Sequence, residues 1–157
     1  MIFFKQNYIN ALSTGDVVAS MAWSGDIYQE NALGTPKGLQ FSTPTDGGLL
    51  WTDNMVIPVG AQHPVDAITL MDYVYRPEIA AMIAEWVAYI TPVQCQTQIV
   101  DDAGGVNNPD TAKALTALAN SPLVFPPPGA SKDLHSYAPL TPEQIPAWTD
   151  AFRRFIA

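Results

Sequence analysis

The spacing of apolar residues predicts a chain built mainly of short helices. Helices are expected over residues 4–13, 27–33, 64–76, 77–89 and 93–100, then from 109 onward and from 142 to the end of the chain. Pro64, Pro77 and Pro109 each occupy an expected first helical position, where the missing N–H of proline leaves no hydrogen bond unmade. Asn108 precedes Pro109 as a capping amide. The second half of the chain therefore carries well-marked helix starts.

Continuous apolar runs predict strands between the first helices. Residues 17–23 read Val-Val-Ala-Ser-Met-Ala-Trp, which is typical of a strand buried on both faces, as in a parallel sheet. Residues 39–42 and 49–58 are further expected strands, and Pro58 closes the last one. Helices that alternate with strands and are followed by more helices predict an α/β fold.

Two of the later helices are expected to bury one face. In the helix that starts at 109, Leu115 and Leu118 are the expected buried positions. The last helix carries an apolar stripe at helical spacing, formed by Ile145, Trp148, Phe152 and Phe155. Such a stripe makes the last helix amphipathic.

Composition narrows the class of protein. The chain has 157 residues, the size of one domain, with 48% hydrophobic and 14% charged residues. This is a globular composition. Seven Lys and Arg against fifteen Asp and Glu give a net charge of −8, which excludes nucleic acid and an anionic membrane surface as natural partners. The charge favours the approach of cationic partners.

The sequence offers little for catalysis or metal binding. Cys95 is the single cysteine, so no disulfide or thiolate cluster can form, and a buried inert thiol is expected. His63 and His135 lie far apart without ligand spacing. Adjacent Asp101 and Asp102 fall in a polar stretch, residues 101–107, that is expected to be a loop. No phosphate-binding, nucleophile-elbow or zinc-protease motif is present, so we expect neither an enzyme, a metal nor a cofactor.

Aromatic side chains and one carboxylate are the remaining candidates for binding. Trp51 and Asp53 lie two residues apart in an expected strand and so share one face. An indole ring and a carboxylate together suit an ammonium group, through its attraction to the ring and a charge-assisted hydrogen bond. Trp23, at the end of the first expected strand, and Tyr89, after a helix, are further candidates. The alternative is that these rings belong to the core and Asp53 to the surface.

Several of these residues fall in a pattern that resembles the bacterial spermidine/putrescine-binding proteins, the extracytoplasmic components of ABC importers. The resemblance is carried by Met-Ala-Trp-Ser-Gly-Asp at 21–26, Gly-Gly-Leu-Leu-Trp-Thr-Asp at 47–53, Arg-Pro-Glu at 76–78 and Tyr-Ile-Thr-Pro at 89–92. It extends over nearly the whole chain, to the amphipathic last helix.

The resemblance implies a fold, a function and roles for five residues. The fold would be part of a type II periplasmic-binding-protein fold, in which two α/β lobes enclose a ligand. Trp23 and Trp51 would be aromatic walls, Asp53 would pair with an ammonium, and Tyr89 would be a further wall or hydrogen-bonding residue. His135 stands near the place where the family often has Gln. The function would be capture of a polyamine, without catalysis, for a membrane permease.

Members of that family are much longer than this chain, which resembles only their C-terminal part. We expect residues 1–50 to belong to the second lobe, 51–58 to cross the hinge and 59–157 to complete the first lobe. No signal peptide is evident at the start, although the resemblance implies a periplasmic or extracellular protein, with or without a membrane anchor. Unpaired sheet edges would favour a homodimer or a swapped assembly, and half a site would bind polyamines weakly.

Other functions stay open on the sequence alone. The same scaffold could capture another amine, an amino-acid derivative or a metal ion. The chain could instead be an interaction module without a ligand, with Trp23 and Trp51 in its core. A small hydrolase or transferase that uses Asp53 and His135 is a third possibility, although no motif supports it.

Overall fold

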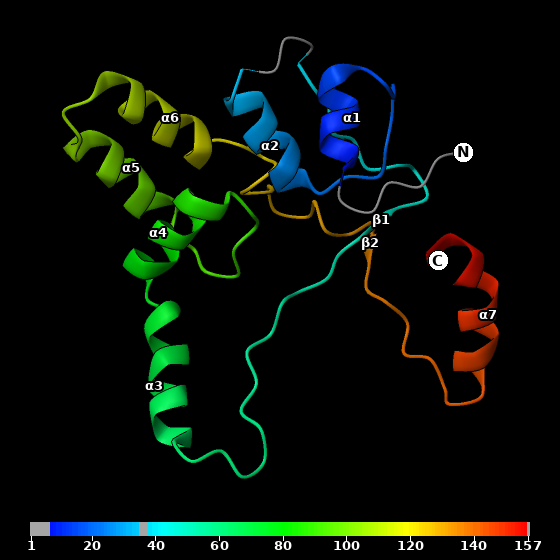
Figure 1. Ribbon diagram of the computed structural model, residues 1–157. Helices are drawn as coiled ribbons and strands as arrows, with labels where there is room; N and C mark the ends of the chain where they lie inside the picture. Colours follow the sequence, from blue (N-terminus) through cyan, green and yellow to red (C-terminus); the bar gives the residue numbers. More distant parts are fainter. Residues whose placement is uncertain (1–6, 35–37, 157) are drawn as a thin grey trace.

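The computed structural model describes residues 7–34 and 38–156, with the side chains of 154–156 excluded. Seven helices and two short strands are present in this part of the chain (Figure 1). In chain order they are α1 (Tyr8–Thr14), α2 (Ser24–Ala32), β1 (Gly48–Leu49), α3 (Pro64–Val74), α4 (Pro77–Val87), α5 (Gln96–Gly105), α6 (Pro109–Ala119), β2 (Leu134–His135) and α7 (Gln144–Ile156).

The predicted helices are confirmed, with small shifts at their ends. Pro64, Pro77 and Pro109 begin α3, α4 and α6, as their position in the pattern indicated. The Asn108 side chain caps α6 by accepting hydrogen bonds from the backbone N–H groups of Asp110 and Thr111. The first predicted helix is present as α1, and residues 4–6 of that prediction lie outside the described part.

The prediction of a loop over residues 101–107 was wrong for 101–105, because α5 continues to Gly105, and only residues 106 and 107 lie outside a helix. Ile99 and Ala103 on this helix are buried, and α5 packs against both α4 and α6. Burial of that face outweighs the low helix propensity of the Asp and Gly residues in the second half of α5. Asp101 and Asp102 therefore lie on the exposed side of a helix rather than in a loop.

The predicted strands over 17–23 and 39–42 were wrong, and of 49–58 only Leu49 lies in a strand. The described sheet is one parallel pair, β1 with β2, in which Gly48 pairs with Leu134 and Leu49 with His135. A strand needs a neighbour to satisfy its backbone hydrogen bonds, and no strand lies beside residues 17–23 within the described chain. Val18 and Met21 in that run are accordingly almost fully exposed.

The main core lies between α4, α5 and α6. It is formed by Ala80, Ala81, Ala84, Ala88, Cys95, Ile99, Leu118, Ala119 and Val124. The many alanines allow the helices to approach closely. The expected burial of Cys95 and of Leu118 is confirmed, and Leu115 packs against the same core. A second, smaller core of Tyr8, Leu12 and Ile27 joins α1 to α2.

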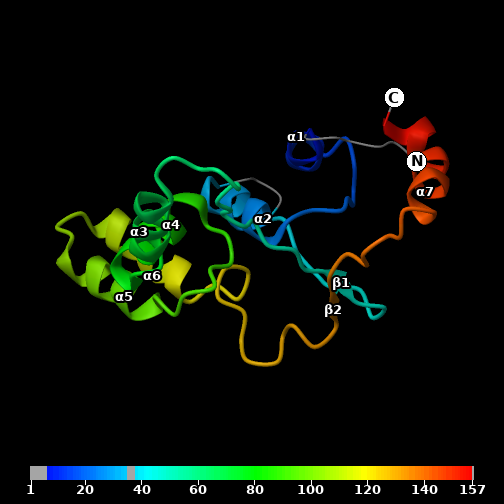
Figure 2. The ribbon, with the colours of Figure 1, turned by 90° about the horizontal axis from the view of Figure 1, so that it is seen from below.

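The last helix lies apart from these cores. Figures 1 and 2 both show α7 at the end of an extended segment, on the opposite side of the molecule from α5 and α6. Ile145, Trp148 and Phe152 of the predicted stripe are about half exposed. Phe155, the fourth member, has no described side chain. The described residues form no helix that is both long and apolar enough to cross a membrane.

The architecture is thus mixed, mostly helical with a small parallel sheet, and belongs to the α/β class. Its helices are set by local signals and by packing of α4, α5 and α6. The segments with strand-like sequence run as extended chain between these helices (Figure 1). The candidate site lies at the start of α2, with side chains from the segments before α2, after β1 and after α4.

Candidate functional site

Two tryptophans from separate segments meet at the start of α2. Trp23 precedes the first residue of α2, and Trp51 follows β1 by two residues. Their ring centroids lie 5.3 Å apart with an interplanar angle of 65°, an edge-to-face contact. Trp23 is 40% exposed and Trp51 is 44% exposed. The indoles are therefore neighbours at the surface and are not sealed in the core.

The first turn of α2 adds a carboxylate that the sequence did not single out. Asp26 accepts a hydrogen bond of 2.5 Å from the Tyr89 hydroxyl at its Oδ1 atom. Its Oδ2 atom accepts a hydrogen bond from the Tyr8 hydroxyl. Asp26 is three residues beyond Trp23 along the chain, and the Tyr8 hydroxyl that bonds Asp26 also accepts a hydrogen bond of 3.4 Å from the Trp23 backbone N–H. Asp26 thus joins Tyr89 to Tyr8, and Tyr8 in turn contacts the Trp23 backbone.

Gly25 allows Tyr89 to reach this position. A Cβ atom on Gly25 would lie 1.9 Å from Cδ1 of Tyr89 and 2.6 Å from the Ala88 carbonyl oxygen. Any larger residue would collide with both. A second link is the hydrogen bond of 2.8 Å from the Gln29 side chain to the Val87 carbonyl. The start of α2 is therefore held directly against the end of α4.

The two tyrosine hydroxyls are held in their protonated form. Burial, the hydrogen bond to Asp26 and the charge of Asp26 raise the pKa of Tyr89 to about 12. Burial, followed by the hydrogen bond to Asp26, also raises the pKa of Tyr8. Both hydroxyls are therefore donors at neutral pH, and Asp26 supplies the acceptor oxygens at this place.

The two remaining predicted site residues are Asp53 and His135. Asp53 is exposed, two residues beyond Trp51, and no hydrogen bond or ion pair involves it within the described part of the chain. His135 lies on β2, and its carbonyl accepts a hydrogen bond of 2.9 Å from Leu50, the residue before Trp51. The structure brings Trp23, Trp51 and Tyr89 to one place and shows no contact of Asp53 or His135 with their side chains.

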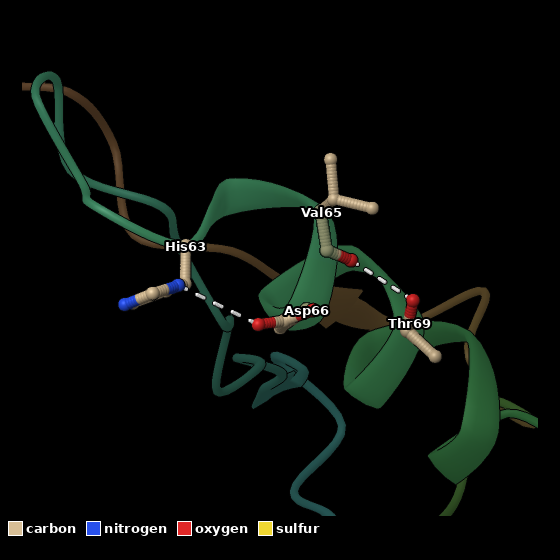
Figure 3. Close-up of polar contacts among 4 residues, drawn as sticks. All are labelled: His63, Val65, Asp66 and Thr69. Carbon is tan, nitrogen blue, oxygen red and sulfur yellow. Dashed lines mark hydrogen bonds and ion pairs between the residues drawn. The ribbon is translucent and has the colours of Figure 1, made fainter.

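The other histidine lies elsewhere. His63 precedes α3, and its Nδ1 atom lies 3.7 Å from the Asp66 carboxylate in the first turn (Figure 3). Both side chains are about 80% exposed, and exposed ion pairs contribute little to stability. Among the residues that the structure describes, no three His, Cys, Asp or Glu side chains gather closely enough to hold a metal ion.

A shallow apolar hollow of about 340 Å³ lies on α3 and α4. Its lining consists of Tyr73, Ile79, Met82, Ile83, Trp86 and Val87. None of these residues belongs to the cluster around Trp23, and the hollow has no carboxylate that could pair with an ammonium. The hollow therefore lacks the combination of indole rings with a carboxylate that is present at the start of α2.

Comparison with known proteins shows the family to which the chain belongs. The family model of bacterial extracellular solute-binding proteins matches residues 2–139. The chain belongs to that family. Its mixed α/β structure is part of the solute-binding fold, and the matched range contains every residue of the cluster.

Curated relatives of this family member are named for the small molecules that they bind. A spermidine/putrescine-binding periplasmic protein of Salmonella typhimurium is 33% identical over 90 residues, which are 57% of this chain and 25% of the relative. A putrescine/agmatine-binding protein of Pseudomonas aeruginosa is 32% identical over 94 residues, 57% of this chain and 26% of the relative. The putrescine-binding periplasmic protein SpuD of Pseudomonas aeruginosa is 22% identical over 97% of this chain and 39% of its own length.

The matched region is only part of each relative. The chain spans about a quarter of the length of the first two relatives and 39% of the third. All three are named as binding proteins and none as an enzyme. No solved structure matches the chain significantly.

Proposed function

We propose that this family member takes part in the capture of a polyamine outside the cytoplasm, as a non-catalytic component of an ABC importer. The observation that carries the proposal is the surface contact of Trp23 with Trp51 at the start of α2, the helix whose first turn carries the Asp26 carboxylate. The names of the relatives support the same class of solute. The net charge of −8 favours the approach of a cation.

Each group in the cluster has a role that follows from its chemistry. An ammonium over an indole gains about 0.5–2 kcal/mol, depending on how dry the contact is. A hydrogen bond to a carboxylate adds about 1.5–3 kcal/mol. We assign Asp26 and Asp53 as carboxylates for ammonium groups, Trp23 and Trp51 as walls for the methylene chain, and Tyr89 as a wall or hydrogen-bonding residue. His135 is assigned as a polar contact at the edge of the site.

The favourable free energy of these contacts must first exceed the free-energy cost of association, which is at least about 4 kcal/mol. We therefore expect the 157-residue chain to bind putrescine with a Kd in the range of about 1 mM, which corresponds to about −4.1 kcal/mol. Tight binding by this chain alone would show that its site is more complete than these contacts indicate.

Nuclear magnetic resonance of the indole N–H groups can test the proposal. Putrescine should shift the signals of Trp23 and Trp51 in proportion to its concentration, and 1,4-butanediol, which has the same chain length and no charge, should not. Trp86, which is 87% exposed and outside the cluster, is the internal control and should not move. Equal shifts with putrescine and butanediol, or none with either, would refute polyamine capture.

The role of Asp53 can be separated from general charge effects. Asp53→Asn and Glu143→Gln each remove one negative charge from an exposed residue. We expect Asp53→Asn to reduce the putrescine-induced indole shift by about tenfold or more, as loss of one hydrogen bond to a charge implies. Glu143→Gln should leave it unchanged. Equal reductions in the two variants would remove Asp53 from the site.

The division of the chain is part of the proposal. We assign residues 1–50 to the second lobe of the solute-binding fold, 51–58 to the hinge crossing and 59–157 to the first lobe. Support comes from residues 50–63, which contain neither helix nor strand and connect β1 to α3 as an extended segment (Figure 1). Limited proteolysis should cut within 51–58 before it cuts in α4 or α5. First cleavage in those helices would contradict the assignment.

We also propose that the 157-residue chain forms a homodimer or a swapped assembly. Its sheet has only two residues in each strand, and Ile145 and Trp148 on α7 are half exposed. An exposed apolar helix face is normally covered by another part of the protein or by a partner. Size-exclusion chromatography with light scattering should therefore give a mass above 17.0 kDa that rises with concentration. A monomer at high concentration would overturn this assignment.

A further inference from the structure

Tyr8 on α1 contacts both parts of the candidate site through one hydroxyl group. The hydroxyl donates a hydrogen bond to Oδ2 of Asp26. The same oxygen accepts a hydrogen bond of 3.4 Å from the backbone N–H of Trp23. One group on α1 is therefore bonded to both residues that α2 contributes to the cluster.

The two tyrosines on Asp26 differ in burial. Tyr8 is only 9% exposed and packs in the small core with Leu12 and Ile27. Tyr89 is 43% exposed. A solute can touch Tyr89, whereas the Tyr8 hydroxyl is already engaged as donor and as acceptor beneath the surface.

The location of the hydrogen bonds explains what Tyr8 can do. Trp23 and Asp26 flank the first turn of α2, and no side chain caps this helix at Trp23. The first turn of a helix has the fewest intrahelical hydrogen bonds and frays most easily. Tyr8 fixes this turn at two points, three residues apart, from a buried and therefore rigid position.

We infer that Tyr8 is a positioning residue, which holds the Asp26 carboxylate and the Trp23 segment in the arrangement that receives an ammonium group. The inference rests on the proposed function for its consequence in binding. Tyr8 itself makes no contact with the solute. Its raised pKa, caused first by burial and then by Asp26, keeps the hydroxyl protonated and so able to donate to the carboxylate.

A double-mutant cycle distinguishes positioning from general structural support. The slope of the Trp23 indole shift against putrescine concentration is measured in the wild type, Tyr8→Phe, Asp26→Asn and the double variant. If Tyr8 acts through Asp26, Tyr8→Phe lowers the slope about tenfold in the wild-type background, the size expected for loss of one hydrogen bond to a charge. In the Asp26→Asn background it lowers the slope less than about twofold, because the charge on which Tyr8 acts is gone. A similar loss in both backgrounds would refute positioning through Asp26.

Tyr28→Phe is the matched control. Tyr28 is a half-buried tyrosine on α2 that packs against the main core, and its hydroxyl forms no hydrogen bond with the described residues. This variant removes a phenol hydroxyl from α2, the helix that carries Asp26, without touching the hydrogen bonds of Asp26. It should retain the wild-type slope. A tenfold loss in Tyr28→Phe as well would show that any hydroxyl removal near α2 weakens binding, which would overturn the inference.

A measurement without ligand separates this inference from the proposed function. The equilibrium constant of urea unfolding for the same four proteins should show coupling of about fivefold or more between Tyr8→Phe and Asp26→Asn. Such coupling together with no putrescine response in the wild type would reject polyamine capture while supporting the Tyr8–Asp26 bond. A putrescine response in the wild type, with no coupling in either measurement, would support capture and reject the role of Tyr8.

Discussion

Gly25→Ala is the substitution whose effect follows most directly from the structure. Gly25 is the second residue of α2, and its φ is not in the left-handed region. Alanine is ordinarily better than glycine in a helix by about 1 kcal/mol. Without any neighbour, the substitution should therefore stabilise the protein. The sign of the measured change consequently reports whether Tyr89 and Ala88 lie against this position.

The lack of space beside Gly25 makes the expected effect of Gly25→Ala on stability unfavourable. The new Cβ atom would lie 1.9 Å and 2.4 Å from two carbons of the Tyr89 ring and 2.6 Å from the Ala88 carbonyl oxygen. Tyr89 can rotate away, at the cost of its hydrogen bond to Asp26. The Ala88 carbonyl is backbone, so relief there requires α4 and α2 to move apart. Overpacking of this kind costs about 1–3 kcal/mol.

Gly104→Ala is the matched control for this prediction. Gly104 is a helical residue of α5 with no atom within 4 Å of its added Cβ, so alanine there should be neutral or stabilising. After the helix gain of about 1 kcal/mol is subtracted, the net cost of Gly25→Ala is up to about 2 kcal/mol. In thermal unfolding, the substitution should therefore lower Tm by up to about 8 °C, since 1 kcal/mol corresponds to about 2–4 °C at this chain length. The indole response to putrescine should fall in the same variant. A Tm increase for Gly25→Ala as well as Gly104→Ala would show that α2 does not pack against Tyr89.

Two further predictions concern α6 and the acidic pair between α4 and α5. Asn108→Ala should lower the free energy of unfolding in urea by about 0.5–2 kcal/mol through loss of the cap, and Asn7→Ala, at a position without a side-chain cap, should change it little. Burial, followed by the nearby charge of Asp102, raises the pKa of Glu85. The protonated form is therefore favoured on folding, and this stability is present at low pH and is lost as the pH rises through the folded-state pKa. In urea unfolding, Glu85→Gln should abolish that decline as the pH rises above the ordinary glutamate pKa, while exposed Glu78→Gln should preserve it. An unchanged pH profile in Glu85→Gln would remove the buried carboxyl as its cause.

Helix starts could be predicted from the sequence because their causes are local. The prolines that begin α3, α4 and α6 and the Asn108 cap act within one turn of the residue that carries them. The strands could not be predicted in the same way. A β-rich run such as 17–23 becomes a strand only when another segment pairs with it, and the described chain supplies pairing only for two residues of β1 and β2.

The candidate site likewise has one part that could be predicted from the sequence and one part that could not. Trp23 and Trp51 could be named from the sequence, and the structure brings their rings into contact. Asp26 was missed, because it falls between the predicted strand that ends at residue 23 and the predicted helix that starts at residue 27. The tyrosines that bond Asp26 are 18 and 63 residues away along the chain. The available signal was an acidic residue in the first turn of a helix that follows directly after Trp23.

The geometry of the ligand-free cluster bears on how a cation would enter. An edge-to-face pair leaves ring faces open that a parallel sandwich would cover, which agrees with the half-exposed indoles. A carboxylate offers about four acceptor positions, and the hydroxyls of Tyr8 and Tyr89 occupy two of those on Asp26. Two positions remain for an ammonium, so the proposed binding requires no side chain to leave. The affinity of such a site then depends on how much of the solute is enclosed, because the cluster supplies orientation and charge while enclosure removes water from the contacts.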